Sequence, residues 1–145
     1  RIEGLKDLSY FVEKMETMSA GRFSSKEEFA EWFKARTKKF AIDVINYCKK
    51  LPYNQATRVV TFQVIKSATS VAANYRAACR GRSGAEFYSK ICTVVEEADE
   101  SVFWLEMAQG AKFENDGIEL DRLLKEASEI LFIAAKARKT ASSKN

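Results

Sequence analysis

Five basic residues between positions 58 and 82 are the clearest indication of chemistry in this sequence. No acidic residue lies between Pro52 and Glu86, so the charge of this stretch has a single sign. The stretch has the apolar spacing of an amphipathic helix, and at about 100° per residue the first four basic residues fall within an arc of roughly 80°. A rigid stripe of one charge suits a polyanion such as a nucleic-acid backbone. The candidate nucleic-acid-binding residues, called the basic stripe below, are Arg58, Lys66, Arg76, Arg80 and Arg82.

The basic stripe also has a simpler explanation, because many such clusters are only solvated or paired with acids of the same protein. The lack of acids along the stretch favours a polyanion partner, as do further basic residues near the C-terminus. Phosphate contacts of this kind position a nucleic acid without reading its sequence. No aromatic pattern typical of sequence-specific RNA recognition accompanies the stripe. The C-terminal basic residues are Lys136, Arg138, Lys139 and Lys144.

Four carboxylates form a second cluster, called the acidic cluster: Glu96, Glu97, Asp99 and Glu100. Glu97 and Glu100 are three residues apart and therefore share one face of a helix. Paired carboxylates can bind a divalent metal or perform acid–base catalysis. We favour charge complementarity instead, in which the acidic cluster neutralises the basic stripe within one subunit or across two subunits. A metal-dependent hydrolase that uses Glu97 and Glu100 remains an alternative function, beside nucleic-acid binding and a purely structural role.

Small polar residues follow one another along the same helix as the basic stripe, at spacings of four, three and four. They occupy an arc between the stripe and the apolar face, where hydrogen bonds with a neighbouring helix or subunit are expected. A monomeric bundle needs only one buried face, so this additional arc predicts an oligomer. The predicted subunit-interface residues are Gln63, Ser67, Ser70, Asn74, Glu97 and Glu100.

Nothing in the sequence resembles a catalytic centre. The chain has no histidine, which removes the commonest general base and most zinc sites. Cys48, Cys79 and Cys92 are scattered near apolar faces and are expected to be small buried hydrophobes without disulfides. No phosphate-binding glycine loop or nucleophile motif occurs. We therefore expect no enzyme activity, no cofactor and no metal.

The composition predicts one soluble, cytoplasmic, all-α domain. A chain of 145 residues fits a single domain, and one proline with six glycines leaves few helix breaks. No apolar run approaches the ~18 residues of a membrane span. The spacing predicts an N-terminal extension over 1–23 with a short amphipathic helix from Leu5 to Met15, a four-helix bundle over 24–140 and a frayed basic tail over 141–145.

Capping residues give the expected helix starts. Ser24 and Ser25 precede the first helix of the bundle, which should end before Pro52. Asn54, Ser83 and Asp116 are the expected N-caps of the next three helices. Short turns between four long helices predict an antiparallel up-down-up-down bundle.

From about Arg36 to the end of the fourth helix, the chain resembles the bacterial four-helix-bundle family of 23S ribosomal RNA intervening-sequence proteins. The resemblance covers about two-thirds of the chain, and its most distinctive parts are the Ser-Ala-Thr-Ser run at 67–70, Ala-Asn at 73–74, Glu-Glu-Ala-Asp-Glu at 96–100 and Trp-Leu at 104–105. It implies a ring-shaped homo-oligomer, typically a homopentamer. The family is similar to the accessory variability protein (Avd) of diversity-generating retroelements, a basic pentamer that partners a reverse transcriptase and binds nucleic acid. The first ~35 residues lie outside the resemblance.

Together these observations predict a non-enzymatic homo-oligomer whose basic stripe binds RNA or DNA backbone, with a reverse transcriptase as the candidate protein partner. The alternative is a pure assembly or scaffold protein, in which the same basic residues meet the acidic cluster of a neighbouring subunit.

Overall fold

The computed structural model describes residues 23–113 and 117–143. Its four long helices are α2 (Lys26–Lys49), α3 (Gln55–Cys79), α4 (Gly84–Gly110) and α5 (Ile118–Ser142). The chain divides into two compact units, Arg1–Phe33 and Lys34–Asn145, and α2 contributes to both. The predicted helix over Leu5–Met15 lies outside the described residues.

The described part of the first unit is the start of α2. Ser25 Oγ accepts a hydrogen bond from the Glu28 amide at 3.1 Å, and Glu28 Oε2 accepts one from the Ser24 amide at 2.9 Å. These contacts satisfy amides at the helix start that have no partner within the helix. The hydrogen bonds from Ser24 lower the pKa of Glu28 below its ordinary value. Just beyond this cap, the rings of Phe23, Phe29 and Trp32 lie 5.1–5.7 Å apart, centroid to centroid.

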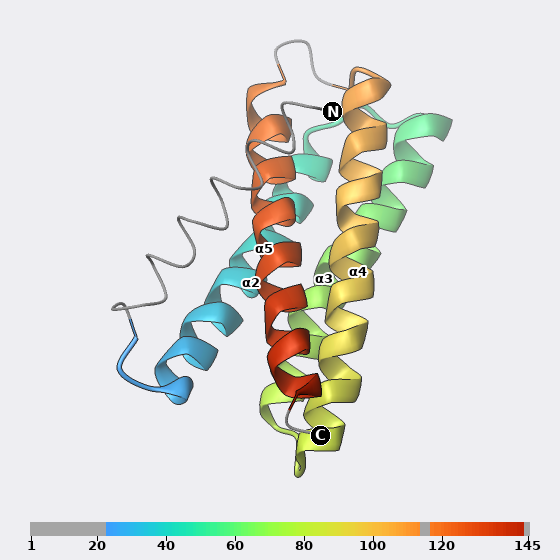
Figure 1. Ribbon diagram of the computed structural model, residues 1–145. Helices are drawn as coiled ribbons and strands as arrows, with labels where there is room; N and C mark the ends of the chain where they lie inside the picture. The colour runs from blue at the N-terminus through green and yellow to red at the C-terminus, as the bar shows by residue number, and fades with distance from the viewer. Residues whose placement is uncertain (1–22, 114–116, 144–145) are drawn as a thin grey trace, which may run out of the picture. The chain divides into compact units, whose positions relative to one another are not determined.

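The second unit is an all-α four-helix bundle, which confirms the predicted fold class. α3, α4 and α5 run in alternating directions, with α3 packed against α4 and α4 against α5 (Figure 1). Large aliphatic and aromatic side chains at helical spacing fill the interior. Those that are almost completely buried include Phe40, Val44, Val71, Ile91, Leu105, Leu123 and Ile130.

Two of the three expected bundle caps are present as predicted. Asn54 and Thr57 form a reciprocal capping box at α3, with both side-chain-to-amide distances at 3.0 Å. Ser83 Oγ accepts a hydrogen bond from the Glu86 amide at the start of α4. The third expected cap, Asp116, lies outside the described residues, and α5 begins after Gly117, whose φ of 69° suits glycine. α5 continues to Ser142, two residues into the segment expected to fray.

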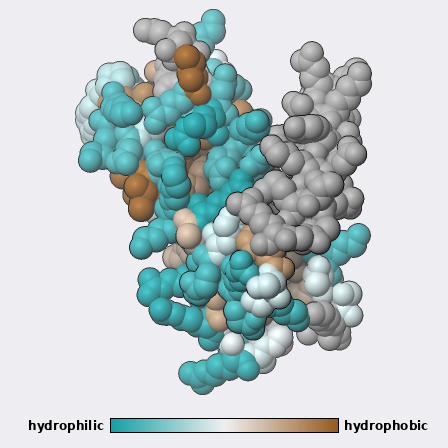
Figure 2. All heavy atoms as spheres, turned by 90° about the vertical axis from the view of Figure 1, so that its left-hand side faces the viewer, coloured by the Kyte–Doolittle hydropathy of each residue, from teal (hydrophilic) through white to brown (hydrophobic). Residues whose placement is uncertain are grey.

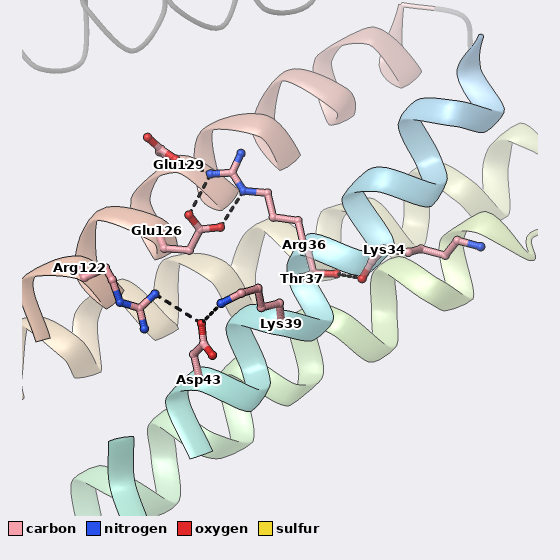
Figure 3. Close-up of polar contacts among 8 residues, drawn as sticks. All are labelled: Lys34, Arg36, Thr37, Lys39, Asp43, Arg122, Glu126 and Glu129. Carbon is pink, nitrogen blue, oxygen red and sulfur yellow. Dashed lines mark hydrogen bonds and ion pairs between the residues drawn. The ribbon is translucent and has the colours of Figure 1, made fainter. Parts of the chain in front are cut away.

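Ion pairs join α2 to α5 within the second unit (Figure 3). Arg36 donates to both oxygens of Glu126, at 2.6 and 2.9 Å, and also pairs with Glu129. Burial lowers the pKa of Arg36, but these two carboxylates outweigh that effect and hold it above its ordinary value. Partial burial likewise raises the pKa of Asp43, yet its pairs with Lys39 and Arg122 leave it below its ordinary value.

Candidate nucleic-acid interface

The basic stripe lies on the exposed side of α3. Val71 is fully buried at the centre of the apolar arc of α3. At about 100° per residue, the three stripe members within α3 and the C-cap Arg80 point roughly 140–180° away from Val71. Because the aliphatic side of α3 faces the core, these four long cationic side chains are directed to solvent. All five members of the stripe are exposed: Arg58, Lys66, Arg76, Arg80 and Arg82.

None of these five residues forms an ion pair with a carboxylate in residues 23–113 and 117–143. Arg36 and Arg122, by contrast, each pair with an acid on a neighbouring helix. Since the stripe has no acidic neighbour along α3, and its side chains form no ion pair with a described carboxylate, its charge is available to an external anion.

Arg80 and Arg82 belong to the turn between α3 and α4. Arg80 is the C-cap of α3, and its amide donates to the carbonyl oxygens of Ala77 and Ala78. Gly81 follows, and a Cβ at this position would lie 3.1 Å from the Ala78 carbonyl oxygen. The Arg82 amide donates to Glu86 Oε2 at 2.7 Å, so its backbone is bound to the first turn of α4. This turn therefore fixes the backbone of Arg80 and Arg82, the last two residues of the basic stripe.

Phe62 lies on the same face of α3 as the basic stripe, although it is not among the predicted site residues. Its side chain is 64% exposed, and it is four residues from both Arg58 and Lys66. Residues four apart are neighbours on a helix surface, so the ring lies between the two cations. Val59, three residues before it, is 50% exposed. The spacing alone could have shown that this aromatic residue shares the face of the stripe.

The acidic cluster lies on α4, with Glu97 half-buried and the other three carboxylates exposed. Partial burial and the neighbouring charges of Glu100 and Glu96 raise the pKa of Glu97, while Lys66 of α3 opposes the rise. The Trp104 indole donates to Glu100 Oε1 at 3.3 Å. Among the described residues, Lys66 is therefore the member of the basic stripe whose charge acts on a carboxylate of the acidic cluster. Among the described residues, no group of three acids or cysteines is arranged to hold a metal ion.

The four predicted subunit-interface residues of α3 divide into two groups. Ser67 is 1% exposed and belongs to the contact between α3 and α4, where the Ser101 hydroxyl donates to Ser67 Oγ at 2.9 Å. The sequence left two contacts open for Ser67, one with a neighbouring helix and one with another subunit. Ser67 makes the contact with a neighbouring helix, so its prediction as a subunit-interface residue is corrected. Small side chains at 67 and 101 let the two helices approach closely.

Gln63, Ser70 and Asn74 remain half-buried on the surface of α3. The Asn74 amide donates to the Ser70 carbonyl oxygen at 2.8 Å and to Ser70 Oγ at 3.0 Å. These bonds lie within one helix, so the predicted contact of these residues with another subunit stays a prediction.

The cysteines are free thiols in different surroundings. Cys48 is buried, and burial raises the pKa of its thiol to about 11. Cys79 and Cys92 are half-buried and therefore less buried than their positions in the sequence predicted. A thiol with such a high pKa is almost entirely protonated at neutral pH, so Cys48 is a poor nucleophile.

The face of the molecule drawn in Figure 2 is mainly hydrophilic, with hydrophobic side chains in separate spots. Scattered apolar residues of this kind are ordinary on protein surfaces. No helix among the described residues is long and apolar enough to cross a bilayer.

Comparison with known proteins gives a structural relative. No family model and no curated protein matches this sequence. One solved structure, a protein of unknown function from the S23 ribosomal protein family of Bacteroides thetaiotaomicron, matches with a TM-score of 0.69 and 26% sequence identity. The match covers 76% of this chain and 97% of the other. This match partly supports the resemblance to intervening-sequence proteins that the sequence indicates. The similarity to Avd stays a prediction.

Proposed function

We propose that this protein is a non-enzymatic, cytoplasmic homo-oligomer that binds the phosphate backbone of RNA or DNA through the basic stripe. The resemblance to intervening-sequence proteins suggests a pentamer, and the similarity to Avd suggests a reverse transcriptase as the protein partner. No cofactor is required, because contacts between cations and phosphates supply most of the affinity of nonspecific binding.

The observation that supports this proposal most strongly is the solvent exposure of the stripe without pairing acids. Arg58 and Arg80 are 22 positions apart, which corresponds to about 33 Å along the helix axis. A rigid row of cations of this length can contact several successive phosphates of one strand. Each contact releases bound counterions from the nucleic acid, which makes binding strong at low salt.

Reversal of two charges tests the proposal. Arg76→Glu with Arg80→Glu should abolish retention of RNA in a gel-shift assay at low salt, because two attractive contacts become repulsive. The matched control is Lys38→Glu with Lys49→Glu, which makes the same change in net charge at two exposed positions of α2. Equal retention by the stripe variant and the wild type would contradict the proposal.

The second candidate is a scaffold protein without a nucleic-acid partner. It is favoured by four half-buried polar residues of the predicted interface set, among which Glu97 has a raised pKa. The other three are Gln63, Ser70 and Asn74. In that case the Arg76→Glu/Arg80→Glu variant should dissociate the oligomer, as measured by light scattering, and the wild type should bind no nucleic acid at any salt concentration.

A further inference from the structure

The exposure of Phe62 adds information that the cations alone do not give. Its ring is 64% exposed, and it makes no contact with another aromatic ring in the described part of the chain. Val59, one turn earlier on the same side of α3, is 50% exposed, and Tyr53, just before the N-cap Asn54, is 85% exposed. Apolar surface is therefore concentrated at the N-terminal end of the basic stripe.

An aromatic ring between two cations distinguishes single strands from duplexes. The phosphates of both forms can contact Arg58 and Lys66, but in a duplex the faces of the bases are covered by their neighbours. In a single strand the bases are free to stack on a protein ring, and every base has a face that can do so. The combination of a basic track with an exposed ring is typical of sites that bind single strands without sequence preference.

We propose that the exposed face of α3 binds single-stranded nucleic acid, with a base stacked on Phe62 and neighbouring phosphates at Arg58 and Lys66. Arg76 and Arg80 then contact phosphates further along the same strand. This inference rests on the proposed function and specifies its substrate class: an unpaired strand or loop instead of a duplex. It requires no particular sequence, because stacking tolerates any base.

The test measures binding of three labelled probes by fluorescence anisotropy at one salt concentration. The probes are a single strand of about 16 nucleotides, near the upper site size of a single module, the same strand in a duplex, and a strand of equal length with abasic sites throughout. The wild type should bind the single strand about ten-fold more tightly than the abasic strand. The duplex should also bind more weakly than the single strand.

Substitutions of Phe62 separate stacking from charge. Phe62→Ala should weaken binding of the single strand about ten-fold and leave binding of the abasic strand unchanged. Phe62→Trp should retain the affinity for the single strand. Phe103→Ala is the matched control, because Phe103 is 49% exposed on α4, outside the stripe, and its removal should change none of the three affinities.

The outcomes distinguish this inference from the proposed function. If the wild type binds all three probes equally and Phe62→Ala changes nothing, the single-strand inference is wrong and the proposed function stands. If the wild type binds no probe, both are wrong. If Phe62→Ala dissociates the oligomer in light scattering and leaves every affinity unchanged, the ring is a contact between protein subunits, which also overturns the inference.

Discussion

At the scale of single residues, the same side chain has different roles according to its neighbours. Arg36 lies between Glu126 and Glu129 and joins α2 to α5. Arg58 and Arg76 have no carboxylate bonded to them among the described residues and point to solvent. A guanidinium held by two acids contributes to stability, whereas a guanidinium in water is available to a ligand.

Glu97 gives a prediction about pH. Partial burial and the charges of Glu100 and Glu96 raise its pKa in the folded protein. The ionised form is therefore disfavoured in the folded state, and the stability of the fold decreases as pH rises through this pKa. Glu97→Gln should raise the free energy of unfolding by about 0.2–0.5 kcal/mol near neutral pH, as expected for removal of a like-charge pair on a helix.

The gain should disappear in acid, where Glu97 is protonated in the wild type. Urea unfolding of both proteins at neutral and acidic pH measures this difference. Glu106→Gln, an exposed substitution on the same helix, controls for the change in net charge. A loss of stability on Glu97→Gln at neutral pH would show that the attraction of Lys66 outweighs the repulsion.

At the scale of helices, the contact between α3 and α4 depends on small side chains. Ser67 and Ser101 are almost completely buried and hydrogen-bonded to each other. Ser67→Val should destabilise the protein by about 1–3 kcal/mol, because a larger side chain must push the helices apart. Denaturant unfolding measures this loss. The control is Ser89→Val, at an exposed position of α4, which should lower the free energy of unfolding by less than about 0.5 kcal/mol. Equal costs at the two positions would show that the contact tolerates extra volume.

Helix starts were predictable because capping depends on residues only three positions apart. Asn54 and Ser83 show this, since each bonds to the amide three residues later. The hydrogen-bond partner of Ser67 was not predictable. The spacing of the residues shows that Ser67 lies on a particular side of α3, but not which helix packs against that side. Phe62 was missed for another reason: its position in the stripe is visible from the spacing, but the exposure of its ring depends on the packing of the bundle.

At the scale of the whole molecule, the distribution of charge matters more than its sum. The net charge is only +4. Nevertheless α3 has no acidic residue at all, while α4 contains the acidic cluster. One face of the bundle is therefore suited to an anion although the chain as a whole is weakly basic. The same separation of charge is what the scaffold alternative requires, in which acidic and basic surfaces of different subunits meet.

The salt dependence of binding measures how many phosphates the basic stripe contacts. Each phosphate neutralised on a single strand contributes about −0.7 to the slope of log K against log salt concentration. If Arg58, Lys66, Arg76 and Arg80 each contact one phosphate, the wild-type slope for a single strand should be about −3. Removal of two of these charges by Arg76→Ala and Arg80→Ala should roughly halve it. Affinity that does not change with salt, or no binding at low salt, would show that the basic stripe does not bind phosphates.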